Sequence, residues 1–113
     1  MATHYVPDEA DIVWLNFTPQ SGHEQAGRRP AVVLSPKAYN KRAGLLVCVP
    51  VTSRIKGYPF EVALSAAGTV GAALADQVKS LDWQARQAER KGTATMVEMA
   101  EIKAKIKSLL KLS

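Results

Sequence analysis

The sequence predicts a small α+β domain, mainly β, in which several short strands form a barrel-like sheet that is closed by one C-terminal helix. Three observations lead to this prediction. The chain has 113 residues, which fits a single domain over residues 1–113. Its apolar residues gather in short runs that are bounded by turn residues, as in strands. Only the last segment repeats apolar residues at helical spacing.

The first half of the chain predicts three strands and a short helix. Residues 11–17 are rich in β-forming residues, whose side chains would alternate between the two faces of a strand. Residues 18–22 are typical of a turn, and the loop that they begin continues to Pro30. Residues 31–35 and 45–51 are short apolar runs, which favours central strands. The segment between them predicts a helix over 36–44, because Pro36 suits a first turn and Gly44 suits the position just past a helix end.

The second half predicts further strands and the terminal helix. Residues 60–64 alternate as a half-buried strand, and two short strands fit 72–76 and 78–81. Thr95 and Glu98 have the spacing of a capping box, in which each side chain accepts a hydrogen bond from the other residue's backbone amide. The apolar residues that follow at helical spacing are Met99, Ile102, Ile106 and Leu109.

Composition and charge exclude several classes of protein. With 47% hydrophobic and 22% charged residues, the chain is a globular protein rather than a disordered one. It has no apolar run of about 20 residues and no signal peptide, so we expect a cytoplasmic protein without a membrane partner. Cys48 is alone, which excludes an internal disulfide. A net charge of +5 attracts polyanions, although a solvated basic face is the simpler alternative.

One loop collects the groups that could do chemistry. The sequence has no phosphate-binding loop, no dinucleotide motif and no metal-ligand spacing, so we expect no cofactor and no metal. Residues 22–30 bring together an imidazole, a carboxylate and two guanidiniums. RNA is cleaved when its 2′-hydroxyl attacks the adjacent phosphate, which needs a base, an acid and positive charge. Glu24 suits the base and Arg29 suits the phosphate. The alternative is that these are only exposed loop charges.

A resemblance extends over essentially the whole chain, in order. The matching segments are YVPD at 5–8, GHEQAGRRPAVVLS at 22–35, VPVT at 49–52, KGYPF at 56–60, ADQVKS at 75–80 and IKAK at 102–105. Together they resemble the MazF/PemK family of toxin endoribonucleases. The resemblance implies an SH3-like, partly open β-barrel of the MazF/CcdB kind with a terminal helix, usually in a homodimer. It also implies cleavage of single-stranded mRNA at short, ACA-like sequences without a metal, leaving a 2′,3′-cyclic phosphate and a 5′-hydroxyl. A MazE-like acidic antitoxin is the implied partner.

The resemblance also implies catalytic residues. Glu24 and Arg29 match the acid–base and transition-state pair of the family, and Thr52 matches a hydroxyl residue near the scissile phosphate. Some relatives carry histidine at the position of Arg28. The general acid therefore stays open between Arg29, protonated Glu24 and water.

RNA recognition adds a second set of candidates. Single-stranded RNA is read by stacking its bases on flat side chains and by hydrogen bonds to base edges and phosphates. Phe17 fits a stacking platform as well as it fits the core. Lysines suit phosphates, and amides suit base edges, with hydrated surface positions as the alternative. The expected RNA-binding residues are Phe17, Arg28, Asn40, Lys56, Gln77 and Lys79.

Two other classes of function compete. The first is a CcdB-like, non-enzymatic toxin that poisons DNA gyrase, but such toxins rely on a Trp-Gly pair near the C-terminus, where this chain reads LLKLS. The second is a non-catalytic SH3-like RNA-binding module, for which an aromatic groove is expected. The seven aromatic residues of this chain are scattered.

Overall fold

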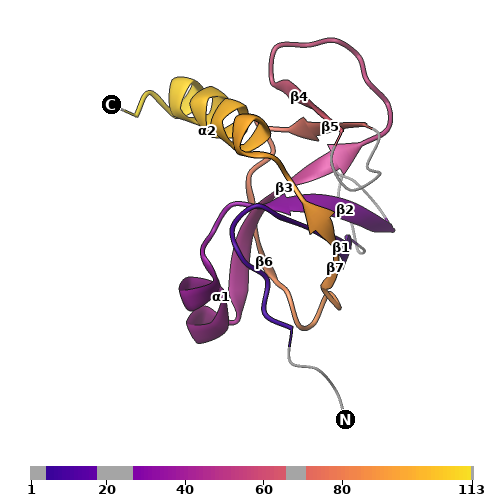
Figure 1. Ribbon diagram of the computed structural model, residues 1–113, viewed down its shortest axis with the longest axis vertical. Helices are drawn as coiled ribbons and strands as arrows, with labels where there is room; N and C mark the ends of the chain where they lie inside the picture. The colour runs from indigo at the N-terminus through magenta and orange to yellow at the C-terminus, as the bar shows by residue number, and fades with distance from the viewer. Residues whose placement is uncertain (1–4, 18–26, 66–70, 113) are drawn as a thin grey trace.

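The computed structural model describes residues 5–17, 27–65 and 71–112 (Figure 1). The first four elements within these ranges are β1 (Asp11–Asn16), β2 (Arg28–Val33), α1 (Lys37–Ala43) and β3 (Leu45–Thr52). The others are β4 (Glu61–Leu64), β5 (Gly71–Leu74), β6 (Lys79–Asp82), β7 (Glu89–Thr93) and α2 (Met96–Leu110). No helix in the described ranges is long and apolar enough to span a membrane.

The strands form one curled antiparallel sheet in the order β4-β5-β3-β2-β1-β7. Strand β3 is shared along its length, because its first half pairs with β6 while its second half pairs with β5. In Figure 1, α1 lies at the first end of β3, and β4 and β5 lie toward the other end. The predicted α+β, mainly β fold with a C-terminal helix is confirmed.

Each face of the sheet has its own apolar core. On one face, Ile12, Val32 and Val49 pack with Met99 and Ile102 of α2. The residues of the second core are Val13, Leu15, Phe17, Ala31, Val33, Leu46, Cys48 and Trp83, with Tyr5, Val6, Leu81 and Ala88 partly buried against them. Neighbouring residues of a strand point to opposite faces, so β1 and β2 contribute to both cores. Each large side chain that is buried contributes about 1.5–3 kcal/mol.

The capping box predicted for the terminal helix is confirmed. The Thr95 hydroxyl accepts a hydrogen bond from the Glu98 amide at 3.0 Å, and the Glu98 carboxylate accepts one from the Thr95 amide at 2.9 Å. The same carboxylate accepts a bond from the Ser65 amide at 2.9 Å, which ties the start of α2 to the end of β4. Burial alone would raise the pKa of Glu98, but these hydrogen bonds outweigh it and hold the pKa below its ordinary value.

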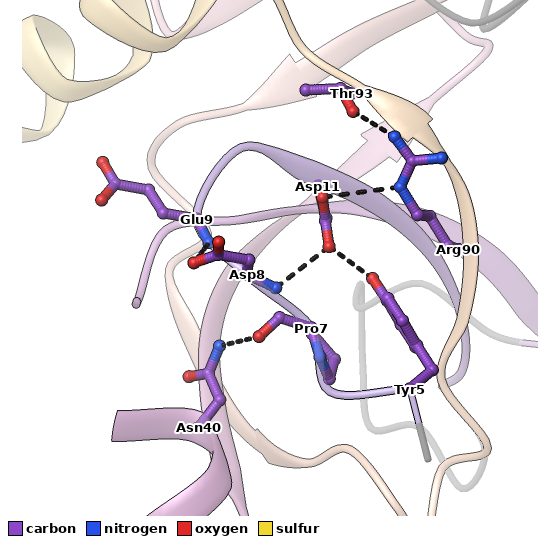
Figure 2. Close-up of polar contacts among 8 residues, drawn as sticks. All are labelled: Tyr5, Pro7, Asp8, Glu9, Asp11, Asn40, Arg90 and Thr93. Carbon is purple, nitrogen blue, oxygen red and sulfur yellow. Dashed lines mark hydrogen bonds and ion pairs between the residues drawn. The ribbon is translucent and has the colours of Figure 1, made fainter. Parts of the chain in front are cut away.

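The N-terminal segment joins α1 to the sheet (Figure 2). The Tyr5 hydroxyl donates to Asp11 at 2.5 Å, and the Arg90 guanidinium of β7 lies 3.7 Å from the other carboxylate oxygen. From α1, the Asn40 amide donates to the Pro7 carbonyl at 2.8 Å. Burial, followed by the bond to Asp11, raises the pKa of Tyr5 far above its ordinary value, so this phenol stays protonated.

Two strand assignments differ from the sequence-based prediction. Strand β7 was not predicted, because its sequence ERKGT shows neither apolar residues nor alternation. It is an edge strand of the sheet, which pairs with β1 on one side and, within the described residues, has no neighbouring strand on the other. Strand β2 begins at Arg28 rather than at residue 31, because Arg28, Arg29 and Pro30 pair with the second half of β1.

Candidate functional site

Arg29 and Thr52 lie on adjacent strands and on the same face of the sheet. Strand β2 pairs with β3 in a register that sets Ala31 opposite Pro50. Side chains at every second position of a strand share a face, so Arg29 lies on the face of Ala31 and Thr52 on the face of Pro50. The register therefore joins two residues that are 23 positions apart in the sequence.

Lys79 belongs to the same face, on the other side of β3, and Gln77 stands shortly before it in the chain. Strand β6 pairs Lys79 with Cys48, and Cys48 shares its face of β3 with Thr52. Gln77 precedes Lys79 by two residues and follows β5, where its backbone amide donates to the Leu74 carbonyl at 3.0 Å. The side-chain oxygen of Gln77 is buried and has no hydrogen-bond partner within the described residues. A buried acceptor of this kind is suited to a donor on a ligand.

Arg28 lies on the opposite face from Arg29. Its guanidinium donates to the Asn16 side chain at 3.1 Å, to the Gln87 carbonyl at 2.8 Å and to Glu89 at 3.3 Å. These contacts hold β2 to β1 and to the chain entering β7. Arg28 was expected to bind RNA, but it lies on the opposite face from Arg29 and its guanidinium is bonded to residues of the sheet and of the turn before β7.

Thr52 is held close to the start of β5. It is 9% exposed, and its hydroxyl accepts a bond from the Arg54 amide at 3.0 Å. Strand β5 begins at Gly71, which has φ of 155°, and a Cβ built there would lie 2.4 Å from the Thr52 carbonyl oxygen. Only glycine lets the backbone of β5 approach Thr52 this closely.

Replacing Gly71 with alanine should therefore displace Thr52. We expect Gly71→Ala to lower the free energy of unfolding by about 1–3 kcal/mol, the usual range for an overpacked site. The measurement is urea unfolding of the variant beside the matched substitution Ala63→Gly, which lies on the exposed side of β4. A Gly71→Ala variant as stable as the wild type would show that the close approach is not a constraint.

The loop that carries Lys56 is fixed from three sides. The Glu61 carboxylate accepts hydrogen bonds from the Lys56 and Gly57 amides at 2.9 and 2.8 Å. The Tyr58 hydroxyl donates to Asp76 at 2.8 Å, which ties the loop to the turn that holds Gln77. Burial, and then the bond to Asp76, raises the pKa of Tyr58 to about 12. From α2, the Lys105 ammonium donates to the Pro59 carbonyl at 2.6 Å. The side chain of Lys56 is exposed.

The loop predicted to hold the base lies largely outside the described residues. Glu24 falls in the range 18–26, so its prediction is not tested here. The flanks of that range are joined, because the Phe17 amide donates to the Gly27 carbonyl at 2.8 Å. Gly27 has φ of 75°, a conformation that favours glycine. The chain therefore enters β2 directly beside the end of β1.

Two of the expected RNA-binding residues are buried. Asn40 is 0% exposed, and its side chain accepts from the Ser35 hydroxyl at 2.6 Å while donating to the Pro7 and Ser35 carbonyls. Its amide is fully used within the protein, so the prediction that Asn40 reads base edges is wrong. Phe17 is 4% exposed and belongs to the core, which favours the core alternative over the stacking platform.

Arg86 was missed by the sequence analysis. Its guanidinium donates to the Asn16 carbonyl at 2.9 Å, and its own carbonyl accepts from the Asn16 amide at 3.0 Å. Burial raises the pKa of Cys48 to about 12, while the charges of Lys79 and Arg86 act in the opposite direction. Lys79 pairs with Cys48 and so lies on the face that carries Arg29, while Arg86 is bonded to the end of β1. Only the tertiary fold reveals this, because Arg86 stands in a turn without any motif.

The described residues contain no group of three or more His, Cys, Asp or Glu side chains that could hold a metal ion. What they gather on one face is positive charge from Arg29 and Lys79, beside Thr52, with Arg86 bonded to the end of β1 and Gln77 two residues before Lys79. Guanidinium groups match phosphate oxygens with paired donors, and an amide can bind a base edge. This chemistry suits a polyanion with bases, such as a nucleic acid.

Comparisons with known proteins identify the family of the chain. The sequence matches the family described as PemK-like, MazF-like toxin of type II toxin-antitoxin system over residues 8–110. It is 56% identical over 110 residues to the endoribonuclease toxin MazF of Escherichia coli strain K12, covering 97% of this chain and 99% of that protein. A crystal structure of MazF from Deinococcus radiodurans has a TM-score of 0.91 and 58% identity, covering 96% of this chain and 99% of that one. A crystal structure of a MazE–MazF complex from the same organism has a TM-score of 0.88 and 55% identity, covering 96% and 100%. The chain therefore belongs to the family of PemK-like, MazF-like toxins of type II toxin–antitoxin systems.

Proposed function

We propose that this protein is the toxin of a type II toxin–antitoxin system and that it inhibits translation by cutting single-stranded mRNA at short, ACA-like sequences. The proposal is supported by the register of β2 and β3, which puts Arg29 and Thr52 on one face of adjacent strands, in a chain that is 56% identical to an endoribonuclease toxin. Lys79 adds positive charge to the same face and Arg86 adds it at the end of β1, which favours a single strand of RNA.

The proposed reaction needs no metal. Glu24 accepts the proton of the 2′-hydroxyl, and the 2′-oxygen attacks the adjacent phosphorus. Arg29 stabilises the negative charge of the phosphorane, with the Thr52 hydroxyl near the same phosphate. The bond from phosphorus to the 5′-oxygen then breaks, and that oxygen takes a proton from Arg29, protonated Glu24 or water. The products are a 2′,3′-cyclic phosphate and a 5′-hydroxyl.

Binding of the strand is assigned to the residues around this pair. Lys56 and Lys79 contact phosphates, and Gln77 offers its buried side-chain oxygen to a donor on a base edge. Arg28 and Asn40 are not part of this set, because their polar groups bind other residues of the protein.

Incubation with a long single-stranded RNA in the presence of EDTA tests the function. We expect cleavage at a small set of short sequences, which sequencing of the new ends would define. RNA that stays intact, together with inhibition of DNA gyrase, would instead support the CcdB-like alternative. RNA that is bound but stays intact would support the non-catalytic module.

A MazE-like antitoxin is the second proposed partner, because solved relatives include MazE–MazF complexes. The net charge of +5 suits an acidic, disordered tail that covers Arg29 and Lys56 of a homodimer and so excludes RNA. We expect the tail to compete with an uncleavable RNA, and its affinity to fall as salt rises. A titration of that RNA into the toxin–antitoxin complex measures the competition. Simultaneous binding, with neither ligand weakening the other, would exclude occlusion.

A further inference from the structure

A cavity of about 650 Å³ lies near the first end of β3, away from Arg29 and Thr52. It is lined by the N-terminal segment, the end of α1 and the turn between β6 and β7, which Figure 1 shows at the end of the sheet remote from β4 and β5. Its main lining side chains are Tyr5, Val6, Lys41, Trp83, Gln84 and Gln87. None of them belongs to the catalytic site.

The lining combines two aromatic residues, of which Tyr5 is partly exposed, with exposed polar groups. The polar ends of the two aromatic residues are engaged within the protein, because the Trp83 indole donates to the Asn40 carbonyl at 2.8 Å and the Tyr5 hydroxyl donates to Asp11. Trp83 is 7% exposed and belongs to the core, so the apolar ring surface offered to the cavity comes mainly from the partly buried Tyr5. Lys41 and Gln84 are exposed at its border. Ring surface beside an amide and a cation is the chemistry that binds a nucleotide of a single strand.

A line of positive charge connects this cavity to the catalytic residues. Strand β3 runs from Leu45 to Thr52, and at ~3.3 Å per residue its seven steps span about 23 Å. Lys79 pairs with Cys48 in the middle of this strand, and Arg86 stands between Trp83 and the end of β1, to which it is bonded. Trp83 and Cys48 share one core, so the cavity and the catalytic residues border the same side of the sheet.

We propose that the cavity is a remote subsite for one nucleotide of the single-stranded RNA, several positions from the scissile phosphate. The base packs on the partly exposed ring of Tyr5, its edge meets the Gln84 amide, and Lys41 binds the neighbouring phosphate. The strand between the two sites follows Lys79 and Arg86. This subsite rests on the proposed endoribonuclease function, and it gives affinity for RNA that extends beyond the cleaved motif.

Binding of a short and a long RNA by a matched pair of variants tests the subsite. Both RNAs carry a deoxynucleotide 5′ of the cut so that they stay intact; the short one holds only the cleaved motif and the long one extends on both sides. Lys41 and Arg42 are adjacent, exposed basic residues in the last turn of α1, and Arg42 does not line the cavity. We expect Lys41→Gln to weaken binding of the long RNA by about 3–10-fold and to leave the short RNA unchanged, whereas Arg42→Gln changes neither.

Abasic substitutions along the long RNA test whether a base occupies the cavity. Abasic nucleotides are placed one at a time outside the motif, and we expect one position to weaken binding to the wild type by about 5–100-fold, as when a stacked base is lost. That loss should shrink in Gln84→Ala. Equal effects of Lys41→Gln and Arg42→Gln, or no sensitive abasic position, would overturn the subsite while cleavage of ordinary RNA continues. A wild type that cleaves no RNA would instead refute the proposed function itself.

Discussion

Arg29→Ala is expected to lower kcat for RNA cleavage by about 10²–10³-fold, because it removes the charge that stabilises the phosphorane. The protein should stay folded, since Arg29 is exposed and lies outside both apolar cores. Glu24→Gln should lower kcat by ~10²–10⁴-fold through loss of the base. Rates are measured under single-turnover conditions on a short RNA that contains the cleaved motif.

The neighbouring arginine is the matched control. Arg28 has the same charge and stands next to Arg29, but its guanidinium binds Asn16, Gln87 and Glu89 on the other face. Arg28→Ala should therefore reduce stability rather than the catalytic rate, with thermal unfolding as the readout. Equal losses of kcat in Arg28→Ala and Arg29→Ala would mean that loss of charge, and not the position of Arg29, explains the effect.

Removing one oxygen from the substrate is the prediction with the largest expected effect. If the 2′-hydroxyl 5′ of the cut is the nucleophile, a deoxynucleotide at that position leaves no group to attack the phosphorus, and cleavage there should be abolished. Binding should change little, because the phosphates and bases remain. The measurement compares cleavage by gel electrophoresis and binding by fluorescence anisotropy for the two RNAs. Cleavage at the normal rate would show that water or a protein group is the nucleophile.

Local patterns were sufficient to predict the elements of the fold that depend on nearby residues. The capping box of Thr95 and Glu98 is confirmed because both partners lie within one turn of helix. Gly44 ends α1 with φ of 71°, as the glycine after a helix usually does. Strand β7 could not be predicted, because its residues ERKGT become a strand only through pairing with the edge of β1.

The candidate site also contains residues that the sequence could predict and residues that only the fold reveals. The sequence pointed to Arg29 and Thr52 through a family resemblance, and only the register of β2 and β3 shows that they share a face. Asn40 illustrates the reverse case, because a polar residue that was expected to bind RNA is fully buried and bonded to Pro7 and Ser35. Arg86 stands in a turn and binds the end of β1, and no local pattern marks such a contact.

The chemistry of the new RNA ends tests the central claim most directly. Wild-type protein is incubated with a synthetic single-stranded RNA in EDTA, and the fragments are identified by mass spectrometry. Attack by the 2′-hydroxyl predicts an upstream fragment that ends in a 2′,3′-cyclic phosphate and a downstream fragment that begins with a 5′-hydroxyl. Fragments with a 3′-hydroxyl and a 5′-phosphate, or cleavage that stops when EDTA is added, would contradict the mechanism assigned to Glu24 and Arg29.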